Sequence, residues 1–101
     1  MNIININIPK EFEKDVNIAI SILKEAGCEE IYIFGSIANG DYQNESDIDF
    51  AIRGLPEEKY YKICGKLMRN MEHSFDLVDL DEKGNRFSRF IAEKGVFIRV
   101  A

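Results

Sequence analysis

The chain has 101 residues, the length of one small domain, and 46% of them are hydrophobic, which is enough for a core without disulfides or structural metals. Its net charge of −5 excludes a general attraction for nucleic-acid phosphates. No apolar run approaches the roughly 20 residues of a membrane span, and no basic-then-apolar leader begins the chain. We therefore expect a cytoplasmic protein with a single domain over residues 1–101.

The first third of the chain contains patterns of both strands and helices. Residues 3–8 alternate isoleucine with asparagine, the period-two pattern of an edge strand or extended arm, which Pro9 ends. Apolar residues then recur at helical spacing over residues 11–26, and Gly27 ends that helix. A short apolar run at residues 31–34 predicts a buried strand.

A glycine and a serine follow that strand directly. The segment 36–40 is short enough for one tight helical turn, and its Asn-Gly ending is typical of a turn closure. Residues 41–46 are polar and predict a loop, after which residues 47–53 predict a second strand.

The remaining chain continues the alternation. A helix follows Pro56, and its apolar stripe is predicted to face the core; the stripe consists of Tyr60, Ile63, Cys64, Leu67, Met68 and Met71. A strand at 75–80, a short helix at 86–94 and a last strand at 96–100 complete the pattern. Helices that alternate with strands predict an α/β (α+β) fold, with a small mixed β-sheet flanked by helices.

The two cysteines carry little information about function. Cys28 and Cys64 do not have the spacing of a metal site or of a disulfide framework. We predict two reduced thiols that belong to the core.

Two carboxylates stand two residues apart on the predicted strand 47–53. Asp47 and Asp49 therefore point to one face, about 6.6–6.8 Å apart along the chain, whereas Ile48 points to the other. Like charges in this arrangement repel each other unless a cation lies between them. Two divalent ions roughly 3.5–4 Å apart, each bound to carboxylate and phosphate oxygens, would supply that charge.

A third carboxylate is expected from the predicted strand 75–80. Asp76 and Asp79 are three residues apart and face opposite ways on a regular strand, so only one of them can join the site. Asp76 interrupts an apolar run, whereas Asp79 lies close to the acidic turn at 81–82. We favour Asp76 and keep Asp79 as its alternative.

The Gly-Ser turn has the features of a phosphate-binding site. A strand that passes at once into a helical turn exposes several backbone N–H groups, which bind phosphate oxygens. Gly35 lets the backbone come close to a ligand, and the Ser36 hydroxyl adds a donor. Gly40 closes the turn without a side chain.

Four segments together resemble the polymerase-β-type nucleotidyltransferase superfamily, and most closely its minimal nucleotidyltransferase (MNT) branch, which is often found as the antitoxin partner of HEPN-domain proteins. The segments are FGSIANGD at 34–41, SDIDFAI at 46–52, FDLVDL at 75–80 and FIAEKGV at 90–96. The resemblance covers most of the chain from about residue 12, and the spacing from Gly-Ser to Asp-x-Asp is its specific part.

The resemblance implies a metal-dependent transfer of a nucleotidyl group from a nucleoside triphosphate. It implies catalytic and Mg²⁺-binding roles for Asp47, Asp49 and Asp76, with two ions, and a phosphate-binding role for Gly35 and Ser36. Members of this branch resemble AMP-transferring enzymes that use ATP and modify a tyrosine of a partner HEPN toxin.

One departure from the family pattern is visible. The family often has arginine where this chain has Asn39. If that arginine contributes to triphosphate binding, its replacement weakens the affinity for triphosphate.

Other enzyme classes fit the residues less well. Gly35 and Gly40 have the spacing of a P-loop, but Asp41 and Tyr42 follow in place of Lys-Ser/Thr. An alternative from another class is a non-catalytic antitoxin that blocks a HEPN-type partner by contact alone. The domain is too small to supply a whole acceptor pocket, so either function implies a partner or self-association.

Overall fold

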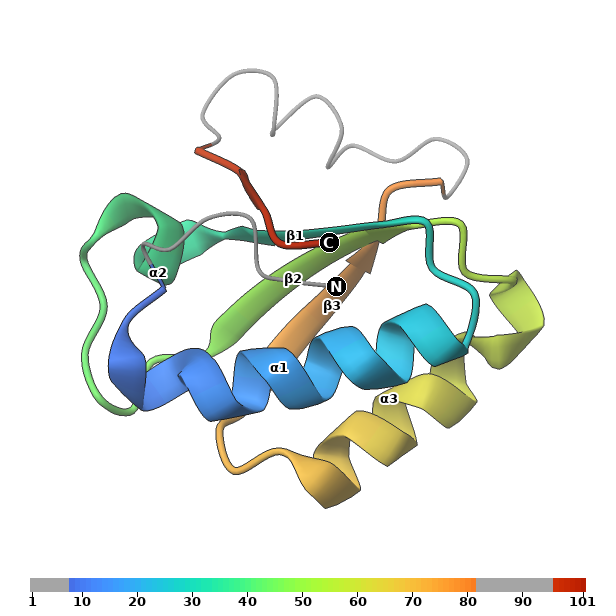
Figure 1. Cartoon of the computed structure of the whole chain (residues 1–101), viewed down its shortest axis with the longest axis horizontal. Coiled ribbons are helices and arrows are strands. Elements are labelled where there is room, and N and C mark those ends of the chain that lie inside the picture. Colours follow the sequence, from blue (N-terminus) through green and yellow to red (C-terminus); the bar gives the residue numbers. More distant parts are fainter. Residues whose placement is uncertain (1–7, 82–95) are drawn as a thin grey trace.

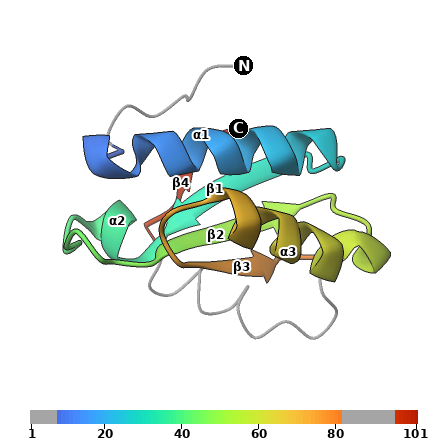
Figure 2. The same cartoon turned by 90° about the horizontal axis from the view of Figure 1, so that it is seen from below.

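One mixed four-stranded sheet forms the centre of the computed structural model, which describes residues 8–81 and 96–101 (Figures 1 and 2). Its strands are β1 (Glu30–Phe34), β2 (Ile48–Arg53), β3 (Phe75–Asp79) and β4 (Ile98–Arg99). The order is β3-β2-β1-β4, so that β3 and β4 are the edge strands among the described residues. β1 is antiparallel to β2 and to β4, whereas β2 and β3 are parallel.

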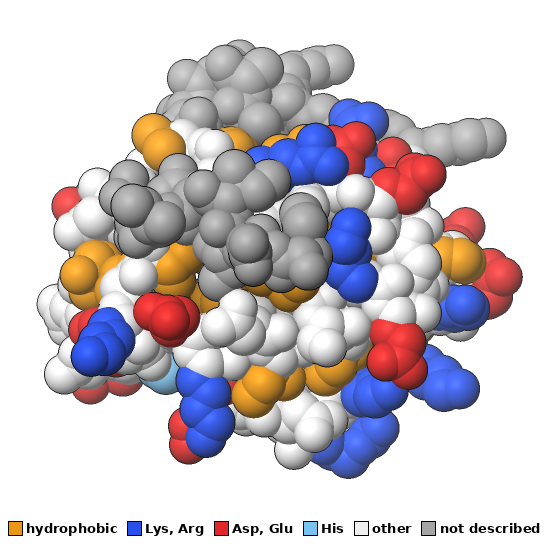
Figure 3. Space-filling view, viewed as in Figure 1, with side chains coloured by type: hydrophobic (Ala, Val, Ile, Leu, Met, Phe, Trp, Pro, Cys, Tyr) orange, Lys and Arg blue, Asp and Glu red, His pale blue; other side chains and the backbone are white. Residues whose placement is uncertain are grey.

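Two longer helices, α1 (Lys10–Glu25) and α3 (Tyr60–Asn70), lie side by side on one face of the sheet (Figure 2). A short helix, α2 (Gly35–Asn39), follows β1 directly, and a 3₁₀ turn, η1 (Glu57–Lys59), leads into α3. Acidic and basic side chains are interspersed over the face seen in Figure 3, as the composition predicts. The predicted α/β fold is therefore confirmed.

The period-two pattern of β2 separates its two faces. Ile48, Phe50 and Ile52 are fully buried against the helices. Asp49 and Arg53 point to the opposite face of the sheet. Burial of a side chain of this size contributes about 1.5–3 kcal/mol, so the apolar positions fix the register and the polar positions follow it.

α1 packs the apolar stripe predicted for it. Phe12, Val16, Ala19 and Leu23 are fully buried. The helix ends as predicted, because Gly27 takes a left-handed φ of 111° and the N–H of Cys28 bonds the carbonyl of Leu23 at 3.0 Å.

The prediction for the stripe of α3 was wrong at one position. Ile63 and Leu67 are buried in the core, but the side chain of Met68 is 71% exposed. Met68 lies on the side of α3 that faces the edge of the sheet, where β3 has no further strand beside it in the described chain. Among the residues that the structure describes, no neighbour is close enough there to bury it.

A buried carboxylate joins α1 to the segment before β3. Asp15 is only 1% exposed and accepts hydrogen bonds from the backbone N–H groups of Glu72 (3.0 Å) and His73 (2.7 Å). The ring nitrogen Nδ1 of His73 lies 2.6 Å from the same carboxylate. Burial alone would raise the pKa of Asp15, but these hydrogen bonds and the nearby imidazole outweigh burial and lower the pKa.

The remaining predicted elements agree with the structure within a few residues. β4 comprises two residues where a strand over 96–100 was predicted. Most of the predicted strand at 3–8 and the whole predicted helix at 86–94 lie outside the described residues. In the parts of the chain that the structure describes, no helix is both long enough and apolar enough to cross a membrane.

Candidate active site

Asp49 and Asp76 are neighbours across the parallel ladder of β2 and β3, where the register places them directly opposite each other. Their carboxyl groups are close enough to share a hydrogen bond, and both lie on the face away from α1 and α3. Asp79 points to the other face, because it lies three residues further along the strand. The structure therefore brings Asp76 to the Asp-x-Asp motif, and it separates Asp79 from it.

Asp47 lies one residue before β2 and is exposed. The hydroxyl of Ser74 donates a hydrogen bond to its Oδ1, and the backbone N–H of Ile48 bonds the carbonyl of Ser74 at 3.0 Å. Sequence reasoning missed Ser74. Its signal is the spacing along the two strands. Ser74 lies two residues before Asp76, and Asp47 lies two residues before Asp49. Because β2 and β3 are parallel and Asp49 faces Asp76, Ser74 and Asp47 also come to face each other.

The three carboxylates make an electrostatically unfavourable group. The pKa of Asp49 is raised from 3.8 to about 6, first because the side chain is partly buried, and then because of the charge and hydrogen bond of Asp76 and the charge of Asp47. Ionisation of this carboxyl costs more free energy than that of an ordinary aspartate, and a nearby cation offsets that cost. The site therefore favours a ligand that brings positive charge.

The Gly-Ser turn adjoins this group from β1. Phe34 pairs with Asp49 in the β1–β2 ladder, and Gly35 follows with a left-handed φ of 74°. A Cβ at Gly35 would lie 2.1 Å from the Oδ2 atom of Asp49, so a side chain has no space there. Ser36 follows at the first turn of α2, and its hydroxyl has no partner in the described chain.

Gly40 ends α2 in the left-handed region, with a φ of 86°. The N–H of Asp41 bonds the carbonyl of Ser36 at 2.9 Å and closes the turn. A Cβ at Gly40 would meet nothing within 4 Å. Gly40 is therefore required by the turn of the backbone, whereas Gly35 is required by contact with the acidic group.

The donor set of this site fits a hard divalent cation, since carboxylate oxygens are the ligands that Mg²⁺ and Ca²⁺ prefer. The register of β2 and β3 places two of these carboxylates, those of Asp49 and Asp76, opposite each other. Within residues 8–81 and 96–101, no three such side chains are already arranged around a common centre. The carboxylate of Asp47 instead accepts a hydrogen bond from Ser74.

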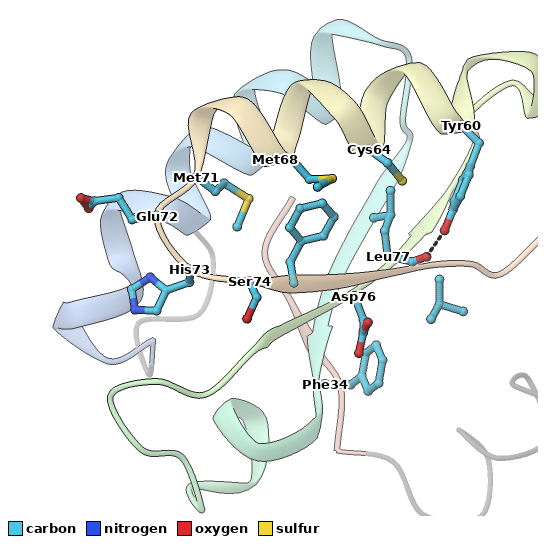
Figure 4. Close-up of a pocket in the computed structure, with 12 residues that line it drawn as sticks. Phe34, Tyr60, Cys64, Met68, Met71, Glu72, His73, Ser74, Asp76 and Leu77 are labelled. Carbon is cyan, nitrogen blue, oxygen red and sulfur yellow. Dashed lines mark hydrogen bonds between the residues drawn. The ribbon is translucent and has the colours of Figure 1, made fainter.

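An open cavity of about 750 Å³ begins at Asp76 and extends along β3 and α3 (Figure 4). Ser74 and Asp76 lie on one side of β3, and Met68 and Cys64 point toward β3 from α3. The candidate site is thus continuous with a space large enough for part of another molecule.

Other polar side chains near the site have structural contacts. Arg53 lies on the Asp49 face, but it is half exposed and its Nη1 lies 3.9 Å from Asp81. His73 is engaged with Asp15. Tyr42 and Tyr61 are exposed. Cys28 and Cys64 are free thiols, as predicted, and burial raises the pKa of Cys28 to about 11.

A mixed sheet with facing carboxylates on two strands and a Gly-Ser turn beside them is the arrangement of a nucleotidyltransferase. The family model described as "Polymerase beta, Nucleotidyltransferase" matches residues 9–100, and the chain belongs to this family. The resemblance found in the sequence is therefore confirmed, and the protein is a nucleotidyltransferase.

Individual relatives agree with this assignment. A protein of Methanocaldococcus jannaschii, provisionally named a protein adenylyltransferase, is 47% identical over 75 residues, which cover 72% of each chain. A toxin–antitoxin crystal structure with AMP-PNP has the same fold, with a TM-score of 0.64, 24% identity, and coverage of 89% of this chain and 73% of that one. A structure of a tri-AMPylated Shewanella oneidensis HEPN toxin with its MNT antitoxin matches with a TM-score of 0.60, 23% identity, and coverage of 85% and 70%.

Proposed function

We propose that this nucleotidyltransferase moves AMP from ATP, with Mg²⁺, to a hydroxyl group of another protein, and that the acceptor is a tyrosine of a HEPN-domain partner. The name of the M. jannaschii relative supports AMP transfer to protein. The crystal structures that share the fold contain AMP-PNP in one case and an AMPylated HEPN toxin in another. They support the choice of nucleotide and of partner.

The observation that carries the proposal is the pairing of Asp49 with Asp76 beside the Gly35 turn. Two neighbouring carboxylates repel each other at neutral pH unless they bind a cation, and the pKa of Asp49 is raised accordingly. A structural role gives no reason to place two of them side by side and to leave a third exposed at the same edge.

Asp47, Asp49 and Asp76 are the residues that would hold the metal. When bound, Mg²⁺ supplies charge neutralisation for the triphosphate and lowers the pKa of the attacking hydroxyl. The Ser74 hydroxyl holds the Asp47 carboxylate at this edge of the sheet. Gly35 keeps the backbone flat against Asp49, so that the phosphates can approach the acidic group.

In the transfer, the acceptor oxygen forms a bond to the α-phosphorus of ATP, and the bond from that phosphorus to the β-phosphate oxygen breaks. Pyrophosphate leaves with the electron pair of the broken bond. The hydroxyl proton passes to a carboxylate, which we assign to the exposed Asp76 at the outer strand. The hydroxyl of Ser36 and the N–H groups of its turn donate to the phosphate oxygens.

The test is transfer of label from [α-³²P]ATP to a co-purified HEPN-domain partner, with the Asp47→Asn/Asp49→Asn double variant compared with the original chain. We expect transfer to fall by at least about 100-fold. Asp79→Asn is the matched control, because Asp79 is an aspartate of β3 that faces away from the site. Undiminished transfer by the double variant would reject the mechanism.

The same assay separates catalysis from blocking. If the partner binds and is inhibited without acquiring label, the chain acts as a non-catalytic antitoxin and the proposed transfer is wrong.

A further inference from the structure

The outer edge of β3 is unoccupied by any other strand of the described chain. A groove runs along it, which we call the β3 groove. It is lined on the helix side by Cys64, Met68 and Met71 of α3 and by Phe75 and Leu77, and on the other side of β3 by Asp76 (Figure 4). The groove therefore passes around the edge of the sheet and reaches the candidate active site.

Backbone groups along this edge are available for pairing. Ser74 and Leu80 bond to β2, so in a parallel ladder the odd-numbered residues of β3 direct their N–H and C=O groups outward. The Tyr60 hydroxyl donates to the outward carbonyl of Leu77. No residue of the described chain bonds the N–H of Leu77 or either backbone group of Phe75.

The rim of the groove on α3 carries apolar side chains that do not pack into the core. Met68 is 71% exposed and Tyr61 is 85% exposed on the same side of the helix. Gly65 lies between them, although glycine is the poorest helix former after proline. Among the described residues, a Cβ at Gly65 would meet only the end of the Arg69 side chain at 3.4 Å, so packing within that part of the chain does not explain the glycine. These three positions indicate contact with another molecule.

We propose that the β3 groove binds an extended segment of the acceptor protein, which adds a strand to the free edge of β3 and places its acceptor hydroxyl on the face that carries Asp76. The proposal that this surface binds a peptide depends only on the groove. The proposal that the bound hydroxyl receives AMP rests on the proposed function. An extended polypeptide is the one occupant that uses both the outward N–H and C=O of Phe75 with the N–H of Leu77 and the apolar wall of α3.

Strand addition also sets a sequence preference. Strands pair about 4.8 Å apart, and successive side chains alternate between the two faces. A residue opposite Asp76 therefore lies on the acidic face, and its two neighbours point toward Met68 and Cys64. We infer that the acceptor residue is flanked on both sides by apolar residues.

The chain contains its own reporter for this binding. Cys64 is half buried in the groove, and Cys28 is buried elsewhere in the core. Two peptides of about ten residues are added to the protein with ATP and Mg²⁺. The first has Val-Tyr-Val at its centre. The second has Val-Lys-Tyr-Lys-Val at its centre, so that its composition is similar but the residues next to the tyrosine are charged. The rate at which N-ethylmaleimide modifies Cys64 is measured, with Cys28 as the internal reference, together with AMP transfer to the peptides.

We expect the Val-Tyr-Val peptide to slow modification of Cys64 at least about tenfold, and the Lys-Tyr-Lys peptide to have little effect. Peptides that are N-methylated at one backbone position each should lose this protection at every second position, because alternate N–H groups of an added strand point toward β3. Met68→Glu should weaken binding at least about tenfold, whereas Lys66→Glu, on the opposite side of α3, should leave it unchanged.

The outcomes separate the two proposals. Protection of Cys64 with the alternating pattern but without labelled peptide would support the docking surface and reject transfer to tyrosine. Four results would overturn the docking proposal. The peptide could be labelled while Cys64 is not protected, or neither peptide could protect Cys64. N-methylation could weaken binding without an alternating pattern, or Met68→Glu could leave binding unchanged.

Discussion

Gly35 lies so close to Asp49 that a Cβ at position 35 would come within 2.1 Å of the Oδ2 atom. The contact joins the end of β1 to the middle carboxylate of the acidic group. It ties the Gly-Ser turn and the Asp-x-Asp motif into one unit, although ten residues separate them in the sequence.

Gly35→Ala should therefore displace the Asp49 carboxylate and lower nucleotidyl transfer by about 100-fold, since small displacements of a reacting group are costly. Gly27→Ala is the control, because Gly27 also has a positive φ but nothing lies within 4 Å of its Cβ position. Both variants should lose about 1 kcal/mol of stability from the strained backbone. Equal transfer rates for the two variants would show that backbone strain, not the contact with Asp49, matters.

Asp49→Asn should abolish transfer yet stabilise the fold at neutral pH. The folded-state pKa of Asp49 is about 6, above the ordinary value of 3.8, so its contribution to stability is fully present below pH 4 and is lost as the pH rises through 6. Asparagine carries no such loss. The free energy of unfolding of the variant should exceed that of the original chain by about 1 kcal/mol at pH 7.5, after allowance for solvent screening, and by almost nothing near pH 4. Urea unfolding at several pH values measures this difference, and a constant difference would contradict it.

Ser74→Ala should change metal dependence more than nucleotide affinity. The Ser74 hydroxyl bonds Asp47, so its removal leaves that carboxylate less well positioned. We expect the Mg²⁺ concentration for half-maximal activity to rise by about threefold to tenfold, since outer partners of metal ligands have effects of this order or larger. The KM for ATP at saturating Mg²⁺ should change little. Ser46→Ala is the control, because the Ser46 hydroxyl bonds the backbone N–H of Gln43 in the loop.

Asp15→Ala should destabilise the fold by about 2–4 kcal/mol, since it leaves the part-buried N–H groups of Glu72 and His73 without their carboxylate partner. His73→Ala retains those backbone bonds and should cost about 1 kcal/mol. The lowered pKa of Asp15 means that its stabilisation is fully present above the ordinary carboxyl pKa of 3.8 and is lost as the pH falls from there through the lower folded-state pKa. Thermal or urea unfolding of the two variants at pH 7 and at a series of pH values below 3.8 tests the ranking and its loss in acid.

Asn39→Arg should strengthen ATP binding. Asn39 is the last residue of α2, is exposed, and stands where the family often has arginine. An arginine near a triphosphate contributes a charge-assisted contact, so the KM for ATP should fall by about threefold to tenfold. The gain should shrink as salt is added. Asn44→Arg in the following loop controls for a general change of charge, and an equal effect there would remove the site-specific explanation.

Much of the fold follows from local patterns that a reader can find in the sequence. The isoleucines and Phe50 of β2 alternate with Asp49 and Arg53, and this period of two determined the burial that the structure shows. Met68 shows the limit of such patterns, because helical periodicity identifies an apolar stripe but not where the neighbouring sheet ends. Asp15 shows another limit, because a carboxylate beside the apolar stripe of α1 gives no sign that it is buried until its partners at 72–73 are placed.

The sequence by itself determined the chemistry available to this protein: an Asp-x-Asp pair, a third aspartate on a later strand, and a glycine that permits a left-handed turn. These features depend only on residue type and on spacing along the chain, so they can be found without a structure. Only the tertiary structure decided that β2 and β3 pair in the register that sets Asp49 against Asp76, and that Ser74 binds Asp47. It also decided that, among the described residues, no strand covers the edge of β3 beside α3. Register and edge exposure depend on contacts between segments distant in the chain, and the free energy of those contacts is distributed over the whole core.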